Sequence, residues 1–234
     1  MSASTPLLLV PGTLCDAALW RHQTDHLGDI ADVSVADHTR HDSMAEIARA
    51  ILAAAPPRFA LAGLSMGGFV AFEIMRQAPE RVAKLALFDT SARPDPPEMV
   101  QRRRDLTKLT DIGQFKGVTP RLLPSFIHAD RLNDQALCRT ITAMAERVGP
   151  EAFIRQQTAN AARPDSRPDL GRIACPTLVA CGRQDALTPL ALSEEMAQGI
   201  PNSTLVVIED CAHLPTLERP QAATALLRYW LQRP

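Results

Sequence analysis

Short runs of apolar residues alternate with longer amphipathic segments along most of the chain. Apolar runs of about 4–8 residues that end at Gly or Pro are typical of buried β-strands, whereas a helix repeats its apolar positions about every 3.6 residues. Strands are therefore expected at residues 7–10, 31–36, 59–64, 84–88, 177–181 and 203–208. Helices are expected at residues 44–55, 69–77, 190–198 and 220–231. This alternation predicts an α/β fold, with a mostly parallel sheet of about six strands flanked by helices.

One long stretch departs from the alternation. Between the proline-rich segments 93–97 and 163–168, only helical patterns occur, near residues 99–110, 121–127, 134–148 and 151–161. We therefore expect residues 93–172 to form an inserted helical cap, with the proline-rich segments as its hinges. The core would consist of residues 1–92 and 173–234, and core and cap together would form a single structural domain.

The third expected strand runs directly into Gly63-Leu64-Ser65-Met66-Gly67, and a helix follows at once. This is a G-x-S-x-G pattern in the strand–turn–helix setting that gives the pattern its meaning. Such a sharp turn requires glycines, and it lifts the Ser65 hydroxyl clear of the sheet. The Met66 amide would lie in the first turn of the helix, where unpaired N–H groups favour an anion. The pattern predicts a nucleophile at Ser65.

An acid and a histidine follow the last two expected strands. Asp185 comes after the fifth strand and His213 after the sixth, so the chain order is serine, acid, histidine. The carboxyl ends of parallel strands meet at one edge of a sheet, where α/β proteins place their sites. Imidazole titrates near neutral pH and can activate a serine hydroxyl, while the acid fixes the imidazole tautomer.

These motifs, together with Pro11-Gly12-Thr13 and the downstream Trp20, resemble those of the α/β-hydrolase superfamily. The resemblance covers roughly residues 5–92 and 173–234 and points to a capped serine hydrolase of the esterase or lactonase kind. It implies a catalytic nucleophile, acid and base at Ser65, Asp185 and His213.

The resemblance also implies an oxyanion hole built from backbone N–H groups. Its donors would be Met66 and Thr13, with Leu14 in place of Thr13 if the turn is offset by one residue. Some members of the family take their acid from the strand that here ends at Asp89. Asp89 is therefore the alternative to Asp185.

The residue types predict acyl transfer. Ser65 would attack the carbonyl of a small carboxylic ester, and water activated by His213 would release the acyl group, with no metal or organic cofactor. The same residues also serve enol-lactonases, C–C bond hydrolases, thioesterases and lyases, and the fold does not choose between them. A further alternative is a protein that binds a small molecule in the capped pocket without turning it over.

The composition limits the partners. Twenty-five basic and 26 acidic residues give a net charge of −1, which offers no long-range attraction to nucleic acid or to an anionic membrane. No apolar run approaches the length of about 20 residues that spans a bilayer, and no basic, apolar leader begins the chain. Five cysteines without C-x-x-C spacing predict no disulfide framework. We expect a cytoplasmic protein with a small-molecule carbonyl substrate, as a monomer or a homodimer.

The candidate substrate-pocket residues carry weaker signals. Leu14, Arg103 and His128 are candidates for the substrate pocket, although residues 102–104 are interpreted mainly as a solvated face, because consecutive helical side chains diverge by about 100°. Further polar cap residues have no assigned role: Arg121, Gln156 and Asn160.

Several remaining side chains are interpreted as having no catalytic or metal-binding role. His22 and His26 have the i, i+4 spacing of a zinc pair, but the intervening sequence lacks the glutamate of H-E-x-x-H and no third ligand follows. We therefore place both histidines on the surface, together with His38 and His41, and predict no metal site. Two cysteines beside the expected site are interpreted as buried small side chains and not as nucleophiles: Cys15 and Cys211.

Overall fold

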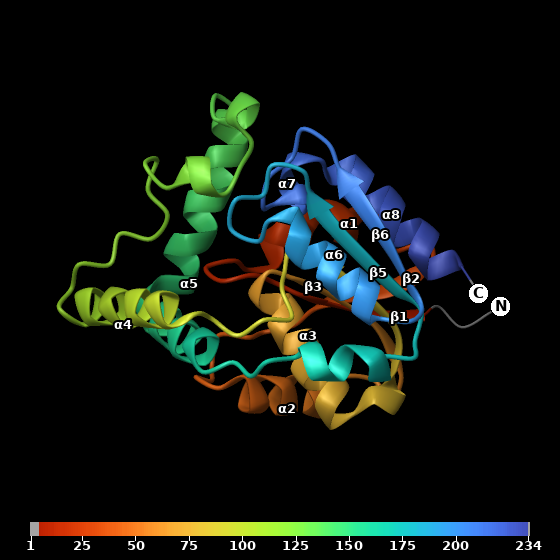
Figure 1. The fold of residues 1–234 in the computed structure, drawn as a ribbon. Helices are drawn as coiled ribbons and strands as arrows, with labels where there is room; N and C mark the ends of the chain where they lie inside the picture. Colours follow the sequence, from red (N-terminus) through yellow and green to blue (C-terminus); the bar gives the residue numbers. More distant parts are fainter. Residues whose placement is uncertain (1–4, 234) are drawn as a thin grey trace.

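A computed structural model describes residues 5–233 (Figure 1). Its six strands form one sheet in which every neighbouring pair is parallel, in the order β2-β1-β3-β4-β5-β6. This confirms the predicted α/β fold and sheet. The strands are β1 (Thr5–Val10), β2 (Ala31–Val35), β3 (Phe59–Leu64), β4 (Val82–Phe88), β5 (Thr177–Gly182) and β6 (Ser203–Ile208).

Alternate residues of each strand enter cores on opposite faces of the sheet. Leu7 and Leu9 belong to one apolar cluster, whereas Leu8 and Val10 belong to the other. The first cluster includes side chains from a 3₁₀ turn, η1 (Ala17–Trp20), from α8 (Pro220–Gln232) and from residues 118–153. The short helix α1 (Arg21–His26) packs against α8. The second cluster packs under α2 (Met44–Ala54), α3 (Met66–Gln77) and α6 (Leu190–Gly199). Two short elements complete this part of the chain, η2 (Pro79–Arg81) and α7 (Pro215–Glu218).

The chain between β4 and β5 consists of helices joined by loops, and most of it extends to one side of the sheet (Figure 1). We call this segment the inserted helices. It contains α4 (Pro97–Asp111), η3 (Leu123–Ser125), η4 (Ala129–Arg131), α5 (Gln135–Ala161) and η5 (Arg167–Arg172). None of the helices within residues 5–233 is long and apolar enough to cross a membrane.

Proline and glycine residues determine where the inserted helices end or bend. The helix expected at residues 121–127 is wrong, because only the short η3 turn forms there, and Pro124 has no N–H with which to continue a helix. Within α5, Gly149 has a φ of 75° and precedes Pro150, so the helix is kinked at that point. The kink separates the two helical segments expected at residues 134–148 and 151–161.

The two ends of the inserted helices are joined at their base. The Ser166 amide donates to the Ala92 carbonyl over 2.8 Å. Nearby, the buried carboxylate of Asp95 is paired with both Arg103 and Arg163. The Arg103 side chain is only 19% exposed, so the solvated face expected for this residue is wrong. Its charge is drawn inward by a carboxylate that precedes α4.

Candidate active site

Ser65 occupies a strained turn between β3 and α3. Its backbone has φ 55° and ψ −114°, a conformation that a side chain adopts only when the surroundings enforce it. The glycines around it are required by close backbone approach, since a Cβ on Gly63 would lie 2.2 Å from the Gly67 carbonyl oxygen. A Cβ on Gly67 would lie 2.1 Å from the Val10 carbonyl oxygen. The turn therefore exists because glycine lets β1, β3 and α3 touch.

Ser65, His213 and Asp185 form a continuous line of hydrogen bonds. His213 Nε2 lies 2.9 Å from Ser65 Oγ, and His213 Nδ1 lies 2.8 Å from Asp185 Oδ2. The structure thus brings together the three residues that the sequence predicted from the ends of β3, β5 and β6. The His213 and Asp185 side chains are buried, with 5% and 0% of their surface exposed. Buried contacts of this kind are strong and directional.

Asp185 is held in its charged form. Its Oδ1 accepts the amides of Leu187 and Thr188 at 2.8 and 3.0 Å, and its Oδ2 accepts the Thr188 hydroxyl at 2.5 Å. Burial alone would raise the pKa of Asp185, but its electrostatic interaction and hydrogen bond with His213, together with the bonds to Thr188, outweigh it, so the pKa lies well below its ordinary value. A carboxylate in this position orients the imidazole and can stabilise an imidazolium that forms during a reaction.

Asp89, the alternative acid, lies near Asp185 and His213 but makes no hydrogen bond to His213 or Ser65. It is fully buried at the end of β4, and its Oδ1 accepts the Gly182 amide at 2.8 Å. Burial and the charge of Asp185 raise the pKa of Asp89 well above its usual range. Asp89, Asp185 and His213 are the one group of potential metal ligands found among residues 5–233. However, the His213 nitrogen that faces the acids is already bonded to Asp185.

Two backbone N–H groups near Ser65 are free to bind an anion. Within the described part of the chain, neither the Met66 amide nor the Thr13 amide donates a hydrogen bond to another residue. The Leu14 amide, in contrast, donates to Gln156 Oε1 at 3.0 Å. This distinction favours Thr13 over Leu14 as the second donor beside Met66.

A buried acid that the sequence did not single out fixes the loop around His213. Glu218 is wholly buried, and its Oε1 accepts the Ala212 and Leu214 amides, both at 3.1 Å. Its Oε2 accepts the His128 amide at 2.6 Å. His128 therefore contacts this loop through its backbone. In the sequence, Glu218 is marked only as an acidic residue that follows Pro215-Thr216-Leu217, five positions after His213.

The other sequence candidates lie in varied surroundings. His38 is buried, and its Nε2 approaches Gly12 and Gln156, so its expected surface position is wrong. Cys15 and Cys211 are buried as expected, and burial, followed by the charge of Asp16, raises the pKa of Cys15 to about 12. His22 and His26 stack on each other at a centroid distance of 4.0 Å.

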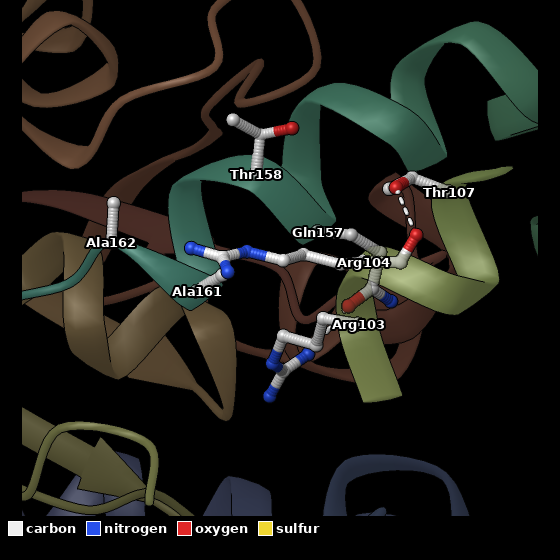
Figure 2. A pocket seen from close by; sticks show the side chains of 7 residues that line it. All are labelled: Arg103, Arg104, Thr107, Gln157, Thr158, Ala161 and Ala162. Carbon is white, nitrogen blue, oxygen red and sulfur yellow. Dashed lines mark hydrogen bonds between the residues drawn. The ribbon is translucent and has the colours of Figure 1, made fainter. Parts of the chain in front are cut away.

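Arg103 lines a hollow of about 260 Å³ between α4 and α5, and none of the three hydrogen-bonded site residues lines it (Figure 2). Besides its contact with Asp95, Arg103 donates to Gln157 Oε1 at 2.7 Å. Arg104 reaches across the same hollow toward Ala161 and Ala162. The guanidinium of Arg103 is thus committed to neighbours in the inserted helices.

The fold and this arrangement define a hydrolase of the α/β class. A family model described as alpha/beta hydrolase fold matches residues 21–220, and the chain belongs to that family. A thermophilic esterase from Thermogutta terrifontis, solved with malate bound, superimposes with a TM-score of 0.90 and 33% identity, over 98% of this chain and 90% of that one.

Two further proteins are similar to this chain. A pimeloyl-acyl-carrier-protein methyl ester esterase from Neisseria meningitidis is 30% identical over 73% of this chain and 68% of its own. The enol-lactonase from Burkholderia xenovorans shares the fold, with a TM-score of 0.88 and 22% identity over 99% and 93% of the two chains. The protein is an enzyme of the α/β-hydrolase class.

Proposed function

We propose that the enzyme is a serine hydrolase that cleaves small carboxylic esters through an acyl-enzyme on Ser65. The observation that carries the proposal is the line of hydrogen bonds from Asp185 through His213 to Ser65, at 2.8 and 2.9 Å. A serine hydroxyl is a weak nucleophile on its own, and an imidazole within hydrogen-bond reach removes its proton as attack begins.

In the acylation step, Ser65 Oγ attacks the ester carbonyl and passes its proton to His213 Nε2. The tetrahedral oxyanion is bound by the Met66 and Thr13 amides, each of which is worth about 3 kcal/mol in the transition state. His213 then protonates the leaving alcohol. Asp185 stabilises the transient imidazolium through the bond to Nδ1.

Deacylation repeats the step with water in place of the serine. His213 takes a proton from the water, the resulting hydroxide attacks the acyl carbon, and Ser65 leaves with the proton returned by His213. We propose that residues 93–172 act as the cap that shields the acyl-enzyme from bulk solvent. The inserted helices touch the His213 loop, since the His213 amide donates to the Phe126 carbonyl at 3.1 Å.

The choice of an ester rests on the relatives. Two of the relatives that are at least 30% identical are named as esterases, one of them for a methyl ester, whereas another, 33% identical over 75% of this chain, is named as a putative non-heme bromoperoxidase. Likeness to the enol-lactonase is a likeness of fold alone at 22% identity. Lactones, thioesters and ring-fission products with a cleavable C–C bond therefore belong in the test as competing substrates.

The first test is the intact mass of the protein after exposure to a fluorophosphonate, with Ser65→Ala in parallel. One adduct on the wild type and none on the variant is the expected result. A panel of methyl, ethyl and aryl esters, lactones and thioesters then identifies the class with the highest kcat/KM. A folded wild type that takes no adduct, even from a small probe, would refute the proposal in favour of a protein that binds ligands without turnover.

A further inference from the structure

The turn that carries the Thr13 amide is held in a strained form. The Cys15 amide donates to the Gly12 carbonyl at 3.1 Å, which closes a four-residue turn. Leu14, at the third position, has a φ of 58°. Thr13, at the second position, is not among the residues with a positive φ, so the turn is of type II, in which the third position is normally occupied by Gly or Asn. A leucine keeps this conformation only when other contacts enforce it.

The enforcing contact comes from the inserted helices. Gln156, in the second half of α5, has no exposed surface, and its Oε1 accepts the Leu14 amide at 3.0 Å. The other end of the carboxamide is fixed as well, because Gln156 Nε2 lies 3.1 Å from His38 Nε2. His38 Nε2 also lies 3.0 Å from the Gly12 carbonyl oxygen, so His38 connects Gln156 to the first residue of the same turn.

Type I and type II turns differ by a rotation of the central peptide, here the one between Thr13 and Leu14. In the type I form Leu14 would return to a negative φ, and its N–H would point away from Gln156. The acceptor on Gln156 therefore selects the type II form. A second contact supports the same turn, since Asn160 Nδ2 donates to Thr13 Oγ1 at 3.0 Å.

We propose that Gln156 is a positioning residue that holds the Thr13–Leu14 peptide in its strained orientation. The Thr13 N–H belongs to the preceding Gly12–Thr13 peptide, so Gln156 acts on it through the turn: with the turn held in this form, the Gly12–Thr13 peptide stays where its N–H is available to the oxyanion. The proposal rests on the proposed serine-hydrolase function. It makes α5 part of the catalytic apparatus, because an enzyme whose inserted helices are displaced would lose the turn that stabilises the transition state. Gln156 itself touches neither substrate nor Ser65.

The test compares second-order rate constants for labelling of Ser65 by a fluorophosphonate, a reaction that uses the oxyanion hole and requires no knowledge of the substrate. Gln156→Met removes the acceptor and keeps the volume, and we expect labelling to slow by about 10- to 100-fold. Gln156→Glu keeps an acceptor for the Leu14 amide and should restore the rate to within about threefold of the wild type.

Gln157→Met is the matched control. Gln157 is also buried, but it accepts from Arg103 and has no contact with the turn, so this variant should label at the wild-type rate. A second experiment, in the Leu14→Gly variant, tests whether the effect of Gln156 depends on the strained backbone of Leu14. In Leu14→Gly the positive φ carries no penalty, and adding Gln156→Met should therefore slow labelling far less than it does with Leu14 present. This pair also keeps the test decisive if Gln156→Met alone folds poorly.

Three results would overturn the inference: labelling of Gln156→Met within twofold of the wild type, an equal loss in Gln157→Met, or an undiminished loss in the Leu14→Gly background. Each of these leaves the proposed function intact, because the wild type is still labelled at Ser65. A wild type that takes no label refutes the proposed function first, and this inference falls with it.

Discussion

Replacing Glu218 by glutamine should destabilise the protein well beyond what a single carboxylate on the surface contributes. The side chain is wholly buried and accepts three backbone amides, from Ala212, Leu214 and His128. A glutamine has one acceptor oxygen and one NH₂ group, so at least one of these amides would face a donor instead of an acceptor. That amide then lies buried and unpaired.

The size of the effect follows from these contacts. A hydrogen bond to a charged group contributes about 1.5–3 kcal/mol, and a buried unpaired N–H costs about 1–3 kcal/mol. Relief of the buried charge offsets part of the sum, which leaves an expected loss of about 3 kcal/mol. For a chain of this length, about 3 kcal/mol corresponds to a fall in melting temperature of about 6–12 °C.

Urea unfolding followed by circular dichroism measures this loss. Glu195→Gln is the control, because Glu195 makes a partly exposed ion pair with Arg93, which solvent screens, and its loss should matter far less. Equal unfolding free energies for Glu218→Gln and the wild type, within about 1 kcal/mol, would refute the reasoning that the loop around His213 depends on this carboxylate.

Three further predictions follow from the site. Asp185→Asn should lower kcat on the best ester by about 10³–10⁴-fold, and a loss below tenfold would instead favour Asp89 as the acid. The folded protein keeps a proton on Asp89 to higher pH than the unfolded chain, which releases it above about pH 4, so this group makes wild-type stability fall as the pH rises. Asp89→Asn should therefore gain stability relative to the wild type as the pH rises above about 4, by up to about 1.4 kcal/mol per pH unit, and a pH-independent difference in urea unfolding would contradict this. Gly67→Ala should abolish folding or cost more than about 3 kcal/mol in urea unfolding, because its Cβ would meet the Val10 carbonyl, whereas Gly171→Ala, with open space around it, should change little.

The sequence predicted those parts of the site that depend on strand order. Ser65, Asp185 and His213 each follow a recognisable apolar strand, and parallel strands bring such positions to a common edge. The sheet could be predicted for the same reason, since its strands are buried on both faces and appear as continuous apolar runs.

What the sequence did not predict depends on contacts between distant elements. Gln156 and Leu14 are separated by 142 positions, and no local pattern marks either as a partner of the other. His38 lies in a polar loop whose composition is typical of the surface, yet the loop folds under α5. Arg103 sits on a polar helix, and its burial becomes visible only once Asp95 is placed beside it.

The closed base of the inserted helices has an evolutionary consequence. Residues 92 and 166, at the two ends of the insertion, are joined by a hydrogen bond. The insertion therefore leaves and re-enters the core at nearly the same point, as a short loop between β4 and β5 would. Each doubling of such a loop costs only about 0.6 kcal/mol in closure entropy. Segments of other lengths can therefore be accommodated between β4 and β5 without disturbing strand register, but a replacement must keep the contacts that Gln156 and Phe126 make with the Leu14 and His213 amides for the site to stay intact.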